Sequence, residues 1–160
     1  KKKYSEDEYK TYILGSAEVV GLMCLKIFCN GNQDEYLKLK PAAMKLGAAF
    51  QKVNFLRDIH ADEEMGRMYF PNWQNKFDEK TKSEIITDIQ QDFEDSMQGI
   101  KLLPKNAKLG VFIAYTYYQN LLQKIKALPA QDLFQNRVRI SDRRKIYLLL
   151  KSYFIYLFNK

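Results

Sequence analysis

Apolar residues recur along this chain at the spacing of helical faces, and clusters of turn-forming residues interrupt them. The turn signals are the cluster at residues 30–32, the loop at 66–73, and the prolines Pro104 and Pro129. Between these breaks we predict helices over residues 6–28, 34–64, 78–103, 105–128 and 141–158. The pattern therefore predicts a single all-α domain of about five helices over residues 1–160.

The second predicted helix carries a narrow polar stripe on an otherwise largely apolar surface. Gln51, Asn54, Asp58 and Asp62 follow one another in steps of three, four and four residues, so they fall on one helical face. Gly47 lies on the same line. The rest of the surface is covered by apolar side chains: Phe50, Val53, Leu56 and Ile59. Such a helix is usually buried, and carboxylates without partners are costly to bury.

The two carboxylates of this stripe favour a metal site. Asp58 and Asp62 lie one helical turn apart and repel each other unless a cation lies between them. Magnesium takes one or two carboxylates and completes its coordination with waters and substrate phosphates. We therefore predict Mg²⁺ ligation by Asp58 and Asp62, with Asn54 and Gln51 placed to hydrogen-bond a ligand oxygen or a metal-bound water. The alternative is an ordinary solvated Asp-x-x-x-Asp face that binds no ligand.

Residues 46–62 and 66–71 resemble the second aspartate-rich motif of the squalene and phytoene synthase family. The shared pattern is a Gln, an Asn three residues later, Leu-Arg-Asp, a second Asp four residues on, and then Gly-Arg-x-Tyr-x-Pro. Residues 12–22 resemble the family's tyrosine-bearing helix, and residues 137–145 resemble its Arg-Val connector. The resemblance covers nearly the whole chain. It corresponds to the C-terminal portion of the family's domain, which is part of an isoprenoid-synthase-type helical bundle.

The resemblance implies head-to-head condensation of two prenyl diphosphates, farnesyl or geranylgeranyl, in which Mg²⁺ assists the departure of diphosphate. The Leu-Arg-Asp form looks more like phytoene-type than squalene-type enzymes. The implied catalytic residues are Tyr12, Asp58 and Asp62, and the implied metal ligands are Asp58, Asp62 and Asn54. The implied substrate-binding residues are Gln51, Asn54, Arg57, Arg67, Tyr69, Tyr118 and Arg137. Arg57 and Arg67 fit a second role equally well, the orientation of the aspartate pair.

A carbocation must be shielded from water, so this chemistry also implies an apolar cavity. Candidates for its lining are Val19, Met23, Phe50, Phe112 and Tyr115. Core packing is the ordinary alternative for each of them.

Two departures from the family pattern keep another interpretation open. No segment matches the family's other aspartate-rich motif. Asp88, Asp92 and Asp95 do share one helical face, but we expect that face to be solvated and not to form a second metal site. Glu18 stands where the family has a small residue. We therefore predict a prenyltransferase of the squalene/phytoene synthase type, of which this chain is one portion that can be inactive by itself. The alternative is a non-catalytic homologue that serves as a binding or assembly module.

Composition and charge limit the partners. The chain has 160 residues and a formal net charge of +7, which suits nucleic acid, an anionic membrane or a phosphorylated substrate. No helix-turn-helix or finger pattern accompanies the charge, so we predict prenyl diphosphate as the partner and no nucleic acid. Cys24 and Cys29 are expected to be free thiols in a cytoplasmic protein.

The sequence also bears on membranes and assembly. No apolar run reaches the roughly 20 residues that a membrane-spanning helix needs. The apolar segment 147–158 predicts the last core helix, with peripheral membrane contact as the alternative. Half of a helical bundle would expose apolar surface, and self-association could cover it.

Overall fold

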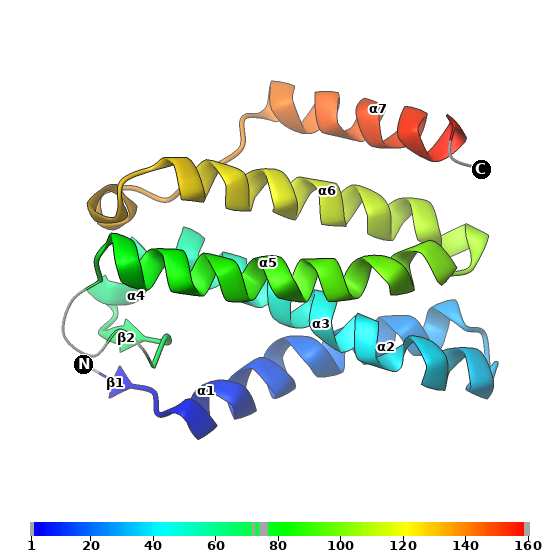
Figure 1. The fold of residues 1–160 in the computed structure, drawn as a ribbon, viewed down its shortest axis with the longest axis horizontal. Coiled ribbons are helices and arrows are strands. Elements are labelled where there is room, and N and C mark those ends of the chain that lie inside the picture. Colours follow the sequence, from blue (N-terminus) through cyan, green and yellow to red (C-terminus); the bar gives the residue numbers. More distant parts are fainter. Residues whose placement is uncertain (1, 72, 74–76, 159–160) are drawn as a thin grey trace.

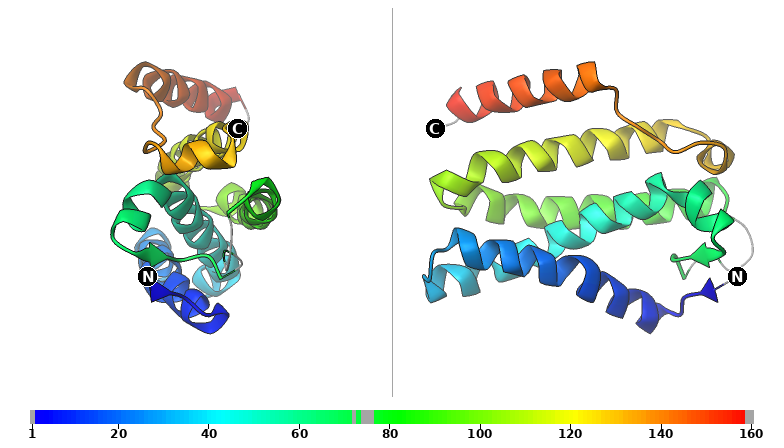
Figure 2. Two further views of the ribbon diagram at one scale, coloured as in Figure 1. Left: turned by 90° about the vertical axis from the view of Figure 1, so that its left-hand side faces the viewer. Right: turned by 180° about the vertical axis from the view of Figure 1, so that it is seen from behind.

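The structure, a computed structural model, describes residues 2–71, 73 and 77–158. Its long helices lie roughly along one direction, with α7 at one edge of the stack and α1 and α2 at the other (Figure 1, Figure 2). The helical elements are α1 (Glu6–Ile13), the π-helical turn η1 (Leu14–Glu18), α2 (Val19–Phe28), α3 (Gln33–Arg57), α4 (Ile59–Glu64), α5 (Glu79–Leu102), α6 (Lys105–Ala127), the 3-10 turn η2 (Ala130–Phe134) and α7 (Asp142–Phe158). The predicted all-α class is confirmed. A short parallel pair, β1 (Lys2–Lys3) with β2 (Arg67–Met68), was not predicted.

Local capping signals set the starts of the helices. Ser5 accepts a hydrogen bond from the backbone N–H of Glu8, and the Glu8 carboxylate accepts one from the N–H of Ser5, so a capping box begins α1. The side-chain oxygens of Asn32 and Asp78 cap α3 and α5 in a similar way. Beyond α2 the chain reverses through Gly31, whose φ of 87° lies in the left-handed region that glycine adopts freely.

The second predicted helix is interrupted at Asp58, which ends α3 and precedes α4. Its φ of −104° and ψ of 10° depart from helical values. The hydrogen-bond ladder nevertheless crosses the interruption, because the N–H of Asp58 donates to Asn54 O and the N–H of Asp62 donates to Asp58 O, both at 2.9 Å. The stripe therefore continues across a local distortion.

The core forms around α3, which packs against η1, α2, α5 and α6. Val53 and Leu56 of α3 are fully buried among side chains of the neighbouring helices. Their buried partners in the same cluster include Ile89, Phe93, Leu121, Leu122 and Ile125. This packing fixes the position of the helix that carries the polar stripe.

Two glycines let α3 approach the first helix backbone to backbone. A Cβ atom on Gly47 would lie 2.5 Å from the carbonyl oxygen of Ala17, and one on Gly21 would lie 2.7 Å from that of Ala43. Both distances are far below an ordinary contact, and the obstructing atoms belong to backbone. Close packing here thus depends on the absence of a side chain at Gly47 and Gly21.

A buried ion-pair network joins α3 to α5. Asp92, which is 2% exposed, accepts hydrogen bonds from Lys45 and Lys52, each at 2.7 Å. Lys52 also pairs with the more exposed Asp88 at 2.5 Å. The expectation that this face of α5 is solvated is therefore wrong for Asp92, because lysines from the neighbouring helix neutralise the carboxylate.

Apolar side chains remain exposed on α2 and α7. On α2 they are Val19, Val20, Met23 and Ile27. On α7 they are Ile146, Tyr147, Leu149, Leu150, Tyr153, Phe154, Leu157 and Phe158. Only Leu148 and Ser152 of α7 are buried, so this helix packs on one side and is not a fully buried core helix. Self-association and peripheral membrane contact stay predictions.

The expectation about membrane-spanning runs needs a correction. The continuous helical stretch Glu6–Phe28 is long and apolar enough to cross a membrane by length and composition, although core helices and N-terminal signal segments meet the same criterion.

Candidate active site

The polar stripe runs along the last turns of α3 and into α4. Gln51 and Asn54 lie on α3, Asp58 lies at the interruption and Asp62 lies on α4, and all four residues are half-buried. The hydroxyl of Tyr118 on α6 donates a hydrogen bond to Asn54 Oδ1 at 3.2 Å. Two residues for which the family resemblance implies substrate binding therefore meet across the α3–α6 interface.

Two guanidinium groups hold the carboxylate of Asp58. Arg57 Nη2 lies 2.6 Å from Asp58 Oδ2, and Arg137 Nε lies 2.6 Å from Oδ1. The hydrogen bond to Asp58 raises the pKa of Arg57 above its ordinary value. The structure thus brings Arg57, Arg137 and Asp58 together. For Arg57 this is one of its two expected roles, orientation of the aspartate pair, whereas Arg137 was expected on the diphosphate.

Asp62 lies in a less favourable environment. Burial, and next the negative charge of Asp58, raise the pKa of the Asp62 carboxyl above its ordinary value, while the positive charge of Arg67 opposes the shift. Two carboxylates close together on one helical face attract a cation. The local field is therefore consistent with the predicted metal site.

The donor set fits Mg²⁺ only in its usual hydrated form. Among the described residues, no group of three or more His, Cys, Asp or Glu side chains could hold a metal ion. The stripe offers the carboxylates of Asp58 and Asp62 and the amide oxygen of Asn54. Magnesium commonly binds through one or two carboxylates, with waters and phosphate oxygens as its other ligands. These three residues would hold the ion on that basis.

We expect Asp62→Asn to stabilise the fold at pH 7. The folded-state pKa of Asp62 lies above its ordinary value of 3.8, so ionising this carboxyl costs stability above that pH. The cost is absent well below 3.8, where both folded and unfolded chains are protonated. Urea unfolding should show a gain of up to about 1 kcal/mol at pH 7 that vanishes in acid. Equal stability of the two proteins at pH 7 would contradict this assignment.

The candidate tyrosines Tyr12 and Tyr69 belong to an aromatic cluster behind the stripe. The ring of Tyr69 stacks on Phe55 with centroids 4.0 Å apart, and the ring of Tyr12 lies 5.1 Å from that of Tyr69. Burial, and next a hydrogen bond with Tyr12, raise the pKa of Tyr69 to about 12. The Tyr69 hydroxyl therefore stays protonated near neutral pH, and the Tyr69 ring has a packing role in the aromatic cluster.

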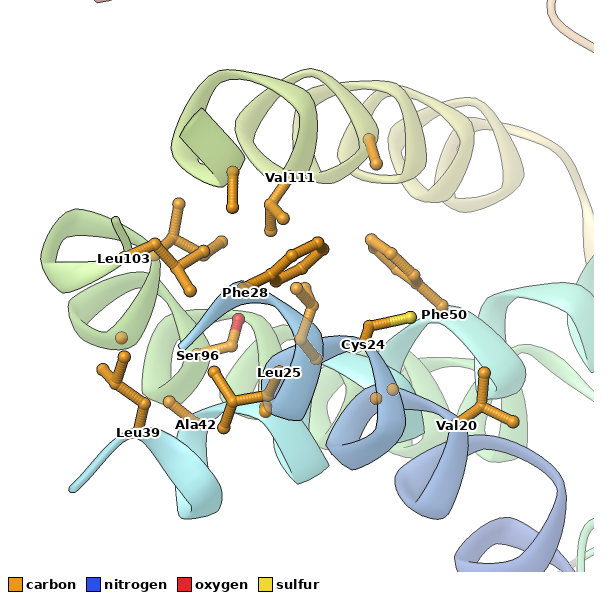
Figure 3. Close-up of a pocket in the computed structure, with 18 of the residues that line it drawn as sticks. Val20, Cys24, Leu25, Phe28, Leu39, Ala42, Phe50, Ser96, Leu103 and Val111 are labelled. Atoms are coloured by element: carbon orange, nitrogen blue, oxygen red, sulfur yellow. The ribbon is translucent and has the colours of Figure 1, made fainter. Parts of the chain in front are cut away.

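An apolar cavity of about 560 Å³ lies between α2, α3, α5 and α6, a size typical of small-molecule sites. Figure 3 shows Phe28, Phe50 and Val111 pointing into it from three different helices. Its wall also includes Val20, Cys24, Leu25, Leu39, Leu103 and Gln51. The cavity therefore has the apolar lining that the resemblance implied.

The predicted lining was largely wrong. Of the expected residues, Phe50 lines the cavity, and the others do not: Val19, Met23, Phe112 and Tyr115. The cavity residues of α2 instead repeat at Val20, Cys24 and Phe28. Val19 and Met23 have the same four-residue spacing one position earlier in the sequence, so the spacing alone does not separate the two faces.

The cavity meets the polar stripe at a single residue. Gln51 lines the cavity and also begins the stripe, whereas Asp58, Asp62 and Arg137 lie outside the cavity wall. Glu18, the unusual residue of the first helix, is half-buried and does not line the cavity either. Burial, and next the charge of Asp92, raise its pKa. Glu18 therefore feels the charge of Asp92, and its backbone packs against Gly47, on which a Cβ atom would lie 3.3 Å from Glu18 Cα.

A family model described as squalene/phytoene synthase matches residues 2–144. The chain belongs to the squalene/phytoene synthase family. A 15-cis-phytoene synthase of Synechocystis sp. is 27% identical over 123 residues, which cover 67% of this chain and 36% of that protein. Phytoene synthase 1 of Solanum lycopersicum is 26% identical over 165 residues, covering 92% of this chain and 40% of that protein.

Another relative in the squalene/phytoene synthase family carries a different activity in its name. The farnesyl diphosphate phosphatase YisP of Bacillus subtilis is 28% identical over 150 residues, covering 85% of this chain and 55% of that protein. The chain therefore spans about one third to just over half of the length of these relatives. Membership in the family is established by the matched residues, and the activity of the whole protein is a separate question.

Proposed function

We propose that this chain forms the part of a phytoene/squalene synthase-type prenyltransferase that holds a prenyl diphosphate. The diphosphate would lie on the polar stripe with Mg²⁺, and the farnesyl or geranylgeranyl chain would extend into the apolar cavity. The relatives named as phytoene synthases and the relative named as a farnesyl diphosphate phosphatase support this class of substrate.

A single feature of α3 supports the proposal most strongly. Its successive turns line the cavity at Leu39, Ala43, Gly47 and Gln51, and then carry the stripe. The lined stretch covers about 18 Å, at about 1.5 Å per residue. An apolar hollow that ends where amide and carboxylate groups begin matches a ligand with a long apolar tail and an anionic head.

The chemistry of these residues suits departure of diphosphate. In the proposed reaction the allylic C–O bond of one prenyl diphosphate breaks, and the diphosphate leaves with the electron pair. The double bond of a second prenyl diphosphate then forms a C–C bond to the allylic cation, and loss of a proton closes the cyclopropyl ring and removes the positive charge. Mg²⁺, when bound, supplies charge stabilisation to the leaving group. Arg57 and Arg137 offer guanidinium donors that match phosphate oxygens, and the apolar cavity keeps water from the cation.

A second candidate is hydrolysis of one prenyl diphosphate, as the name of the Bacillus subtilis relative suggests. Both reactions need the same bound diphosphate, and they differ in what captures the prenyl group. Incubation of labelled farnesyl and geranylgeranyl diphosphate with the protein separates them, because condensation gives a hydrocarbon or its cyclopropyl diphosphate precursor and hydrolysis gives the prenol. Binding with no turnover would identify a binding module.

Calorimetric titration with Mg²⁺ and a farnesyl thiodiphosphate analogue tests the binding proposal. We expect Asp58→Asn to weaken binding of the pair about tenfold or more, since a charged ligand contact is lost. Asp34→Asn, an exposed carboxylate on the same helix, is the matched control and should leave binding unchanged. Equal binding by the wild type and Asp58→Asn would refute the head-group site.

A cavity variant tests the tail separately from the head group. Val111→Trp should fill the cavity from α6 and lower the affinity for the thiodiphosphate analogue. The affinity for inorganic pyrophosphate with Mg²⁺ should stay unchanged. Unchanged binding of the analogue would place the prenyl chain elsewhere.

A further inference from the structure

Both oxygens of Asp58 are engaged by arginine side chains. Arg137 Nε lies 2.6 Å from Oδ1, and Arg57 Nη2 lies 2.6 Å from Oδ2. Arg57 Nε adds a contact of 3.1 Å to Oδ1. By contrast, within the described part of the chain Asp62 has no ion pair at comparable range and feels Arg67 through its charge alone. Of the two carboxylates of the stripe, Asp58 is therefore held by two arginines, whereas Asp62 is not held by an ion pair among the described residues.

The two arginines differ in how firmly they are held. Arg57 neighbours Asp58 in sequence, sits on α3 and is 21% exposed in its side chain. Arg137 reaches Asp58 from the connector between η2 and α7, and its side chain is 47% exposed. A long, half-exposed side chain on a connector can change partner without moving a helix. Arg137 is therefore the more readily displaced of the two.

A guanidinium on a carboxylate competes with a metal ion for the same oxygens. It neutralises the negative charge that attracts the cation, and its own positive charge repels the incoming ion. Phosphate oxygens offer a guanidinium an equally suitable, more highly charged partner. When the pair between the guanidinium and the carboxylate breaks, a ligand that carries diphosphate and a cation gives each group a new partner. The guanidinium binds the diphosphate, and the carboxylate binds the cation.

We infer that Arg137 is a positioning residue that occupies Asp58 until a diphosphate arrives and then transfers to the diphosphate oxygens, which leaves Asp58 free for the cation. This inference rests on the proposed function. The exchange makes the site bind cation and diphosphate together in preference to either one alone. It also gives the Arg137–Asp58 contact a role beyond orientation of the carboxylate.

The first part of the test measures the binding of Mn²⁺ alone, which is detected by its electron paramagnetic resonance signal. Arg137→Gln should bind Mn²⁺ about two- to fivefold tighter than wild type, the range expected when a partly exposed ion pair no longer competes. Arg139→Gln removes the same charge from the same connector without touching Asp58 and should remain close to wild type. Asp58→Asn identifies the part of the signal that belongs to this site.

The anion arm uses inorganic pyrophosphate without metal. Asp58→Asn frees Arg137 and should bind pyrophosphate several-fold tighter than Asp62→Asn, which removes an equal negative charge but releases no arginine. Circular dichroism confirms that each variant keeps the helical fold. The expected pattern is a gain in Mn²⁺ affinity in Arg137→Gln together with a gain in pyrophosphate affinity in Asp58→Asn.

The outcomes separate this inference from the proposed function. If Mn²⁺ binding is lost in Asp58→Asn but is equal in Arg137→Gln and Arg139→Gln, the exchange is refuted and the metal site stands. If neither wild type nor Arg137→Gln binds Mn²⁺ through Asp58, both the exchange and the metal site are refuted. Equal pyrophosphate affinity in Asp58→Asn and Asp62→Asn also overturns the exchange.

Discussion

Replacement of Asp92 by alanine is expected to lower the free energy of unfolding by about 3 kcal/mol, near the lower end of the range for breaking a buried ion pair. Asp92 is 2% exposed and accepts from Lys45 and Lys52. Its loss would leave Lys52, with an 11% exposed side chain, without its buried partner. Lys45 is half-exposed and can regain water, which moderates the cost.

The matched control is Asp88→Ala. Asp88 pairs with the same Lys52, but its side chain is 60% exposed, so its removal should cost no more than about 1 kcal/mol. Urea unfolding of the three proteins, followed by circular dichroism, measures both values. Similar losses for the two aspartates would show that burial of Asp92 adds nothing to the α3–α5 contact.

Substitution of Gly47 by alanine has the second largest expected effect, a loss of about 1–3 kcal/mol from overpacking. The added methyl group would lie 2.5 Å from the carbonyl oxygen of Ala17, a backbone atom that cannot turn aside. The helices must separate, and the cavity that Gly47 and Ala17 line must change shape. The thiodiphosphate analogue should therefore bind more weakly as well.

Gly110→Ala is the control for helix propensity. Gly110 lies within α6, and a Cβ atom there would meet nothing within 4 Å. Alanine is the better helix former, so this variant should gain up to about 1 kcal/mol. Thermal and urea unfolding give the comparison. Stabilisation by both substitutions would show that α3 and η1 are not in the close contact described above.

The helix starts and the polar stripe were predictable because their causes are local. Ser5, Asn32 and Asp78 cap helices through backbone N–H groups three residues away, and these residue types at such positions indicate a helix start. The stripe followed from helical spacing alone. The family resemblance added roles for its residues, which spacing could not supply.

Other features depended on contacts between distant segments. The distortion at Asp58 occurs where Arg137, 79 residues away, meets the chain. Burial of Asp92 depends on lysines 40 and 47 residues away. The cavity face of α2 was missed partly because the π-helical turn η1 changes the angular register of the first helix. A constant number of residues per turn, applied from residue 6 to residue 28, could not reproduce that change in register.

The connector that carries Arg137 is anchored independently of Asp58. Val138 and Ile140 are buried in the core, and Lys124 of α6 donates to the carbonyl oxygen of Arg139 at 2.6 Å. Arg144, at the start of α7, reaches Asn120 of α6. Departure of Arg137 from Asp58 would therefore leave the backbone seated and require rotation about side-chain bonds only. Such a rearrangement is fast compared with loop opening, so the exchange of partners proposed for Arg137 would not require movement of the fold.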